Sequence, residues 1–118
     1  MITIYGLKNC DTCRKARKWL DAEGLQHHYK DARTDALESK TIARWIAVVG
    51  WEALLNRRGT TWRTLSDRDK HAVDQDKALA LMLEHPALIK RPVFEINKTV
   101  LVGFKDDVRK ILKGLKNG

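Results

Sequence analysis

The chain of 118 residues contains only two cysteines and two prolines, and several patterns typical of other protein classes are missing from it. Apolar residues nowhere continue for about eighteen positions, so we expect no membrane-spanning helix and no membrane partner. The first residues lead directly into a strand pattern, without the charged leader and apolar stretch of a signal peptide. Together these absences predict a cytoplasmic protein whose thiols are reduced at rest.

The sequence also lacks any run of like charges, although its formal net charge is +8. Its 23 lysines and arginines are spread over the whole length and interleaved with 15 acidic residues. A nucleic-acid-binding segment would gather its basic residues in one run or on one face. We therefore interpret the charge as a solvated basic surface and do not expect nucleic acid as a partner.

No internal repeat, low-complexity tract or linker rich in proline, glycine or serine divides the chain. Its length and its 43% hydrophobic content are ordinary for one globular domain. Apolar residues nevertheless change from strand spacing to helical spacing in the middle of the chain. We predict a single domain over residues 1–118, with a helical insertion at about 37–85.

Strand patterns lie on both sides of this insertion. Residues 2–5 and 26–30 predict strands, and between them a helix runs from Asp11 to a C-cap at Gly24. Residues 93–96 and 99–102 predict a hairpin with Asn97-Lys98 as its turn, and an amphipathic helix follows it. The order β-α-β, helical insertion, β-β-α predicts an α/β fold with a parallel first pair and an antiparallel last pair.

Three features inside the insertion predict helix boundaries. Residues 42–49 carry apolar side chains at helical spacing, and Gly50 stops that helix. Ser66, with an acidic residue three positions later, resembles a capping box and predicts a helix start. Residues 76–84 predict a further helix that ends before Pro86.

Cys10 and Cys13 lie three residues apart at the predicted turn from strand to helix. A helix N-terminus carries unpaired N–H groups and a partial positive charge, which together lower the pKa of a thiol placed there. We therefore predict that Cys10, flanked by Lys8 and Arg14, is a reactive thiol. Cys13 is either a resolving thiol that attacks a Cys10 adduct or a small core residue.

Neither a structural disulfide nor a metal site is indicated. A disulfide that closes so short a loop removes little entropy from the unfolded chain. Zinc requires four ligands, and no pair of histidines has a recognisable ligand spacing among His27, His28, His71 and His85. Near the hairpin, Arg91 can offer a two-pronged contact to a carboxylate or oxyanion, and Pro92 opens a strand.

Three segments resemble one known family. They are YGLKNCDTCRKA at 5–16, LLNRRGTTWR at 54–63 and LIKRPV at 88–93, and they resemble the arsenate reductase-related ArsC family, nearest to its YffB-like branch. The resemblance implies a thioredoxin-like fold with a mixed four-stranded sheet. It implies that Cys10 is the catalytic nucleophile, supported by Arg91, and that Pro92 is a cis proline facing it. The substrate-binding residues that we expect beside Pro92 are Lys8, Asn9, Arg14 and Arg58.

The resemblance also implies an activity, that of a thiol-dependent oxidoreductase without a bound cofactor. Its YffB-like branch implies glutathione as the reducing co-substrate, or a glutaredoxin-type reductant. Arsenate reductases of this family hold the oxyanion with three arginines, of which Arg91 matches one. At the arginine position near the last hairpin, this chain has Gly103 and Phe104. At the mid-chain position it has Asn56, with Arg57 or Arg58 as substitutes. We therefore do not expect efficient arsenate reduction.

The Spx-like branch of the family is the second-nearest resemblance. Spx-like regulators have a Cys-x-x-Cys motif, lack the same arginine near the last hairpin, and bind RNA polymerase instead of turning over a substrate. The alternative prediction is therefore a redox-sensing regulator that binds the RNA polymerase α subunit. In Spx-like regulators a glycine in the helical insertion is important to that contact, and Gly50 lies near the corresponding position. The need to end a helix also accounts for a glycine at position 50.

Overall fold

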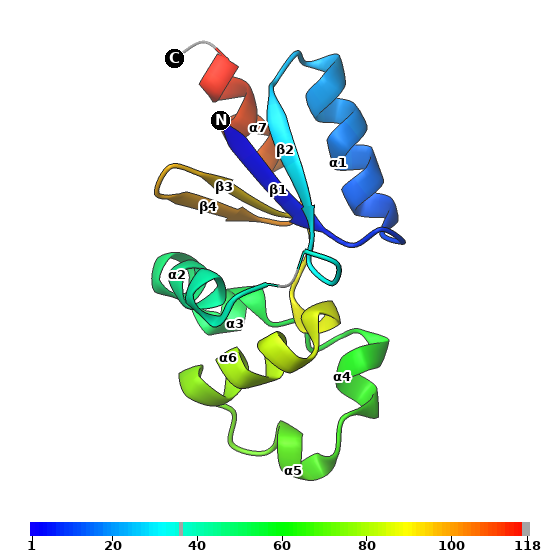
Figure 1. Ribbon diagram of the computed structural model, residues 1–118, viewed down its shortest axis with the longest axis vertical. Helices are drawn as coiled ribbons and strands as arrows, with labels where there is room; N and C mark the ends of the chain where they lie inside the picture. Colours follow the sequence, from blue (N-terminus) through cyan, green and yellow to red (C-terminus); the bar gives the residue numbers. More distant parts are fainter. Residues whose placement is uncertain (36, 117–118) are drawn as a thin grey trace. The chain divides into compact units, whose positions relative to one another are not determined.

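The computed structural model describes residues 1–35 and 37–116 (Figure 1). It divides into two compact units, one formed by residues 1–35 and 91–118 and the other by residues 36–90. The second unit covers the predicted helical insertion at 37–85. The single domain over residues 1–118 stays a prediction, and positions 36, 117 and 118 of it lie outside the described residues.

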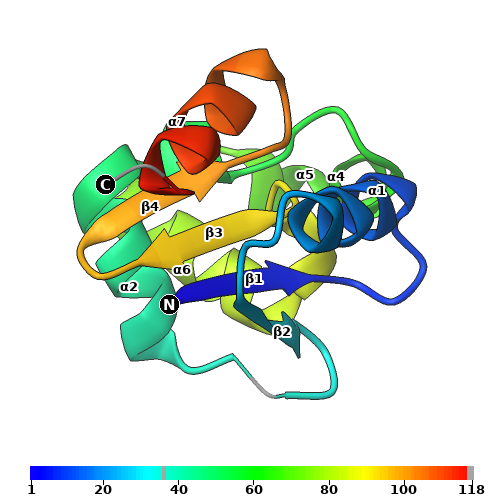
Figure 2. The ribbon, with the colours of Figure 1, turned by 90° about the horizontal axis from the view of Figure 1, so that it is seen from above.

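The first unit contains one mixed sheet of four strands, in the order β2-β1-β3-β4 (Figure 2). Strand β1 pairs in parallel with β2 and antiparallel with β3, and β3 pairs antiparallel with β4. The predicted α/β class, mixed sheet and strand directions are therefore confirmed. The strands are β1 (Ile2–Gly6), β2 (His27–Asp31), β3 (Val93–Ile96) and β4 (Thr99–Val102).

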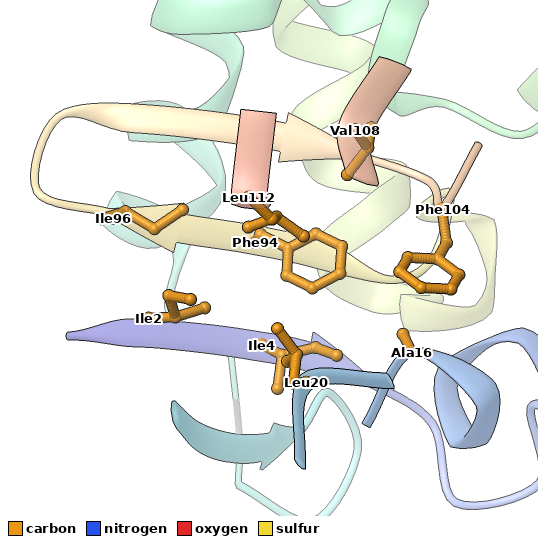
Figure 3. Packing of buried hydrophobic residues seen from close by; sticks show 9 residues of the cluster. All are labelled: Ile2, Ile4, Ala16, Leu20, Phe94, Ile96, Phe104, Val108 and Leu112. Atoms are coloured by element: carbon orange, nitrogen blue, oxygen red, sulfur yellow. The ribbon is translucent and has the colours of Figure 1, made fainter. Parts of the chain in front are cut away.

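Two helices, α1 (Asp11–Ala22) and α7 (Asp106–Lys116), pack with β1 and β3 around one hydrophobic core (Figure 3). Each helix presents buried apolar residues at helical spacing, which are Ala16 and Leu20 on α1 and Val108 and Leu112 on α7. The element order is the one predicted for a thioredoxin-like fold. The buried residues of this core are Ile2, Ile4, Ala16, Leu20, Phe94, Ile96, Phe104, Val108 and Leu112.

Strand β2 gives the weakest sequence signal because it is an edge strand made largely of polar residues. Its residues alternate between half-buried and exposed up to Asp31, which is buried. The turn between β3 and β4 is confirmed at Asn97-Lys98, where Asn97 has a φ of 55°. Asparagine tolerates this left-handed conformation better than most residues, which is why the sequence predicts a two-residue turn here.

The second unit is helical. Its largest pair is α2 (Ser39–Val49) and α6 (Gln75–Glu84), which contact each other through buried apolar side chains. Gly50 ends α2 with a φ of 85°, a conformation that favours glycine. The remaining elements are the short helices α3 (Trp51–Leu54), α4 (Thr60–Thr64) and α5 (Asp67–Lys70) and the 3-10 helix η1 (Pro86–Leu88).

Two details of this unit differ from the sequence reading. Ser66 caps a helix as predicted, and its Oγ accepts a hydrogen bond from the Asp69 N–H at 3.2 Å, but α5 is only one turn long. A separate cap, Asp74, begins α6. Helix α4 is not predicted at all, because none of its residues is buried and its apolar spacing gives no signal.

The segment that follows α3 and the end of the second unit are joined by backbone hydrogen bonds. The Asn56 N–H donates to the Leu88 carbonyl at 2.7 Å, and the Lys90 N–H donates to the Leu54 carbonyl at 2.8 Å. These bonds flank an antiparallel bridge between Leu55 and Ile89. Within the described residues, no helix combines the length and apolar character needed to cross a membrane.

Leu112 and Ile111 are neighbours on α7, and they offer a direct test of this packing. Leu112 is fully buried, whereas Ile111 is 48% exposed. We expect Leu112→Ala to lower the free energy of unfolding by about 2–5 kcal/mol, because it leaves a cavity in the core. Ile111→Ala is the matched control and should cost less than about 1 kcal/mol. Urea denaturation followed by far-UV circular dichroism measures both, and equal losses would contradict the described orientation of α7.

Candidate functional site

Cys10 lies at the N-terminus of α1, where it is the N-cap residue. Its backbone is extended, with φ −106° and ψ 113°, and its Sγ accepts a hydrogen bond from the Cys13 N–H at 3.3 Å. A sulfur in this position takes the place of the oxygen that a serine or aspartate cap presents. The thiol is neither fully buried nor fully exposed, so a substrate sulfur can reach it.

Cys13 lies one turn later and is 1% exposed. The space for it comes from Gly6 at the end of β1. A Cβ atom on Gly6 would lie 2.7 Å from the Cys13 Sγ and 3.4 Å from a ring carbon of Tyr29. Glycine at position 6 therefore lets the buried sulfur pack directly against the backbone of β1.

Arg91 and Pro92 precede β3, and the peptide bond between them is cis, as the family resemblance implied. Pro92 is buried, and its carbonyl accepts the Gly103 N–H at 2.8 Å. Arg91 hydrogen-bonds to the Cys10 sulfur. The structure thus places two predicted site residues from distant parts of the sequence, Cys10 and Arg91, in direct contact.

The pKa of Cys10 results from opposing effects. Burial of the thiol raises it, but hydrogen bonds from the Cys13 side chain and N–H lower it, and so do the hydrogen bond and positive charge of Arg91. The stabilising contacts prevail, and the pKa of Cys10 lies below its ordinary value. Hydrogen bonds and a cation favour the charged form of an acid, so the thiolate is the form that this site stabilises.

The pKa of Cys13 moves in the other direction. Burial and its hydrogen bond to Cys10 raise the pKa of Cys13 to about 12. At neutral pH Cys13 is therefore a protonated thiol that donates to the Cys10 sulfur. The two cysteines therefore differ, since Cys10 is the stabilised thiolate and Cys13 is its hydrogen-bond donor.

The other predicted residues of this segment lie on the surface around Cys10. Lys8 and Asn9 are exposed in the turn between β1 and α1, and Arg14 is exposed on the first turn of α1. Arg14 forms an ion pair with Asp11. Their side chains are available to a ligand at Cys10, and their roles in binding stay predictions.

Asp31, which the sequence reading does not single out, is a polar residue that the structure connects to the Cys10 segment. It is 9% exposed and ends β2, and its Oδ2 accepts the Lys8 N–H at 3.0 Å. Its Oδ1 accepts the N–H groups of Arg33 at 2.8 Å and Thr34 at 3.1 Å. Burial raises the pKa of Asp31, but these hydrogen bonds lower it by more. The pKa of Asp31 therefore lies below its ordinary value, and the carboxylate is ionised.

A signal for Asp31 was present in the sequence. It directly follows the predicted strand 26–30, and the carboxyl ends of parallel strands meet at the same edge of a sheet. Gly6 could have been found in the same way, since it ends the first strand and precedes the cysteine pair. Tyr29 gives no such signal, because an aromatic residue in an edge strand is common.

Arg58 belongs to the second unit, and its predicted role stays a prediction. Its side chain is exposed, and its N–H donates to the Asn56 Oδ1 at 3.0 Å. Arg57 instead lies over the ring of Trp51, with its guanidinium carbon 5.9 Å from the ring centre.

Gly103 and Phe104, where the family resemblance implied a missing arginine, are parts of the first unit's backbone and core. Gly103 has a φ of 86°. Phe104 is buried against Trp19, with ring centres 5.5 Å apart, and against Phe94. The Arg109 guanidinium carbon lies 4.6 Å from the centre of the Phe104 ring. The position is thus occupied by an apolar anchor for α7.

No group of three or more potential metal ligands occurs among histidine, cysteine, aspartate and glutamate in residues 1–35 and 37–116. The polar groups that contact the Cys10 sulfur are the Arg91 guanidinium, the Cys13 N–H and the Cys13 thiol. Such donors bind anions and stabilise a thiolate.

Comparisons with known proteins agree with this geometry. The YffB protein has a solved structure that is 41% identical to this chain, with a TM-score of 0.90, and the match covers 95% of this chain and 98% of that one. An arsenate reductase (ArsC) related protein from Brucella melitensis is 43% identical with a TM-score of 0.77, over 93% and 92% of the two chains. The fold is therefore thioredoxin-like, as predicted.

Similarity also extends to a regulator. The global transcriptional regulator Spx 2 of Bacillus anthracis is 27% identical over 95% of this chain and 87% of its own length. The model of the ArsC family matches residues 5–111, which include Cys10, the helical segment and Arg91. The chain belongs to the ArsC family.

Proposed function

We propose that this protein is a thiol-dependent oxidoreductase in which the Cys10 thiolate attacks a disulfide substrate and glutathione supplies the electrons. The observation that carries the proposal is the environment of Cys10. Its sulfur is accessible, accepts the Cys13 N–H at 3.3 Å and is hydrogen-bonded by Arg91. A thiolate stabilised in this way is both the nucleophile and the leaving group of thiol–disulfide exchange.

The reaction proceeds in three exchanges. The Cys10 thiolate attacks one sulfur of the substrate disulfide, forms a mixed disulfide with it and releases the other half as a thiolate. A glutathione thiolate then attacks the Cys10 sulfur, releases the second half and leaves glutathione bound to Cys10. A second glutathione thiolate attacks that glutathione sulfur and restores the Cys10 thiolate. One substrate disulfide becomes two thiols, and two glutathione molecules become one oxidised glutathione.

An external thiol suits the resolving step better than Cys13 does. With a pKa of about 12, only roughly one Cys13 thiol in 10⁵ is ionised at pH 7. Loss of the negative charge on Cys10 in a mixed disulfide removes one cause of that high pKa. Burial, the larger cause, persists.

Positive groups around Cys10 suit a substrate that carries carboxylates, as glutathione does. Arg91 hydrogen-bonds to the sulfur, while Lys8, Asn9 and Arg14 are exposed neighbours of Cys10 along the chain. We propose Arg91 as a catalytic residue because it contacts the reacting atom, and the other three as binding residues, with Arg58 and Pro92 as further parts of the site. A glutaredoxin-type protein is the other candidate reductant, and this chemistry keeps the cytoplasm as the predicted location.

Arsenate is a poorer substrate for this site. Phe104 is buried and Gly103 has no side chain, so neither provides a charged group for an oxyanion. A single arginine beside Cys10 stabilises one thiolate but does not surround a tetrahedral oxyanion.

The rate of Cys10 alkylation by iodoacetamide should rise with pH and level off above a midpoint lower than that of an ordinary cysteine. Only the thiolate reacts with iodoacetamide, and the pKa of Cys10 is lowered. The midpoint of its alkylation therefore lies at a lower pH than that of an ordinary cysteine. Arg91→Met should move the midpoint upward and slow alkylation below it by roughly threefold to tenfold. Peptide mass spectrometry assigns the alkylated cysteine.

The matched control for that charge change is Lys110→Met, an exposed lysine on α7. Its midpoint should equal that of the wild type. An unchanged midpoint in Arg91→Met would mean that Arg91 does not stabilise the thiolate.

Oxidised glutathione should add one glutathione to the wild type and to Cys13→Ser, but none to Cys10→Ser. Only Cys10 combines accessibility with a stabilised thiolate, whereas Cys13 is buried and protonated. Intact-protein mass spectrometry reads the adduct directly. Modification of Cys10→Ser at the wild-type rate would refute the nucleophile assignment, and loss of two hydrogens in the wild type but not in Cys13→Ser would make Cys13 the resolving thiol.

Similarity to Spx 2 favours a second candidate, a redox-sensing regulator that binds the RNA polymerase α subunit. Gly50 gives it no separate support, because the C-cap of α2 already requires a positive φ. If this candidate is right, the protein should retain the C-terminal domain of the α subunit in a pull-down and the retention should differ between oxidising and reducing conditions. Cys10→Ser should abolish that difference. Equal binding, or none, in both conditions favours the enzyme.

A further inference from the structure

We propose that Asp31 is a positioning residue that holds the turn between β1 and α1, and through it the nucleophile Cys10, at the end of the parallel β1–β2 pair. The inference rests on the proposed role of Cys10. It concerns a residue that touches neither the Cys10 sulfur nor a substrate. Its effect is transmitted through one backbone hydrogen bond.

Four protein groups converge on the Asp31 carboxylate. Oδ2 accepts the Lys8 N–H at 3.0 Å, and the Tyr29 hydroxyl lies 3.5 Å from the same oxygen. Oδ1 accepts the N–H groups of Arg33 and Thr34. The carboxylate therefore ties the turn that follows β2 to the turn that follows β1. A buried carboxylate is costly unless hydrogen bonds satisfy it, and here donors reach both oxygens.

The Lys8 N–H belongs to a tight turn that leads directly to the nucleophile. The Cys10 N–H donates to the Leu7 carbonyl at 3.2 Å, which closes a turn with Lys8 and Asn9 as its central residues. The Lys8 N–H is not used within that turn, and the Asp31 Oδ2 takes it up. The turn is consequently joined to the sheet by the chain at its β1 end and by the Lys8 N–H at its centre, and its other end leads into α1.

Parallel pairing places Asp31 where this contact can form. Gly6 and Asp31 are paired at the last position of the β1–β2 register, and the Ala32 N–H donates to the Gly6 carbonyl at 2.8 Å. The hydrogen bonds at the end of the β1–β2 pair thus fix the backbone from which the Asp31 carboxylate projects. A shift of the turn would move Cys10 away from Arg91, which approaches from the segment before β3.

The direction of a pH effect separates positioning from simple electrostatics. Loss of the Asp31 negative charge would, by charge alone, stabilise a nearby thiolate and lower the pH midpoint for Cys10. Loss of the tether would weaken the contact of Cys10 with Arg91 and raise the midpoint. Charged and titratable groups are present on every side of the two residues. Cys13 and Arg91 interact with Cys10, and Asp11 and Arg14 lie on the first turn of α1. The groups around Asp31 are Lys8, Arg17, Tyr29, Arg33 and Asp35.

Asp31→Asn keeps the shape of the side chain but replaces one acceptor oxygen with an NH₂ group. We expect it to raise the pH midpoint for iodoacetamide alkylation of Cys10 and to slow alkylation below that midpoint by roughly threefold or more, the effect of half a pKa unit. Asp11→Asn removes the same charge beside the thiol without touching the turn. Its midpoint should stay at the wild-type value or fall.

A second pair of variants removes the donor instead of the acceptor. Lys8 is the first central residue of the turn, a position that proline favours, and proline has no N–H. Lys8→Pro should raise the midpoint relative to Lys8→Ala, which loses the side chain but keeps the N–H. This comparison decides the question if Asp31→Asn does not fold, as judged by thermal unfolding.

Upward shifts in folded Asp31→Asn and in Lys8→Pro relative to Lys8→Ala support the positioning role. A midpoint at or below the wild-type value in folded Asp31→Asn, or equal midpoints in the two Lys8 variants, overturns it. These alkylation measurements do not involve glutathione. Failure of oxidised glutathione to modify wild-type Cys10 would therefore count against the proposed function alone.

Discussion

The register of β1 with its two neighbours is the constraint on which the site depends. Gly6 pairs with Asp31 in the parallel direction, and Tyr5 pairs with Val93 in the antiparallel direction. The C-terminal ends of β1 and β2 and the N-terminal end of β3 therefore lie side by side at the same end of the sheet. The turn to Cys10, the Asp31 carboxylate and the Arg91–Pro92 segment are brought together although up to about eighty residues separate them in the sequence. A shift of one residue would exchange the faces of β1 and remove its side chains from the core.

Burial has opposite results for the two cysteines. Desolvation raises the pKa of both thiols, and it is the largest single effect on each. Cys10 receives hydrogen bonds from Cys13 and Arg91, which lower its pKa. Cys13 donates to Cys10 and lies beside the negative charge of the Cys10 thiolate, and both effects raise the pKa of Cys13. Each cysteine therefore strengthens the difference between them. Gly6 maintains this asymmetry because it lets Cys13 sit deep enough to remain protonated.

Much of this arrangement could be predicted from the sequence. Apolar spacing located the strands and both core helices, and the hairpin turn and Gly50 followed from local backbone preferences. Helix α4 could not be found, because a short exposed helix has no apolar face. The contact between Cys10 and Arg91 could not follow from spacing alone, since it depends on long-range strand pairing. The family resemblance supplied Arg91, whereas the place of Asp31 directly after a predicted strand was a signal that the sequence interpretation did not use.

Phe104 shows how the anion site of this fold can change without loss of the fold. It joins α1 and α7 through its contacts with Trp19 and Arg109, so an aromatic ring there contributes to packing. Replacement of Phe104 by arginine would remove the ring contacts with Trp19 and Phe94. Cys10 and Arg91 do not depend on this position, because the β1–β3 pairing places them. The chain therefore keeps a thiolate stabilised by an arginine, while Gly103 and Phe104 contribute no charged side chain to the site.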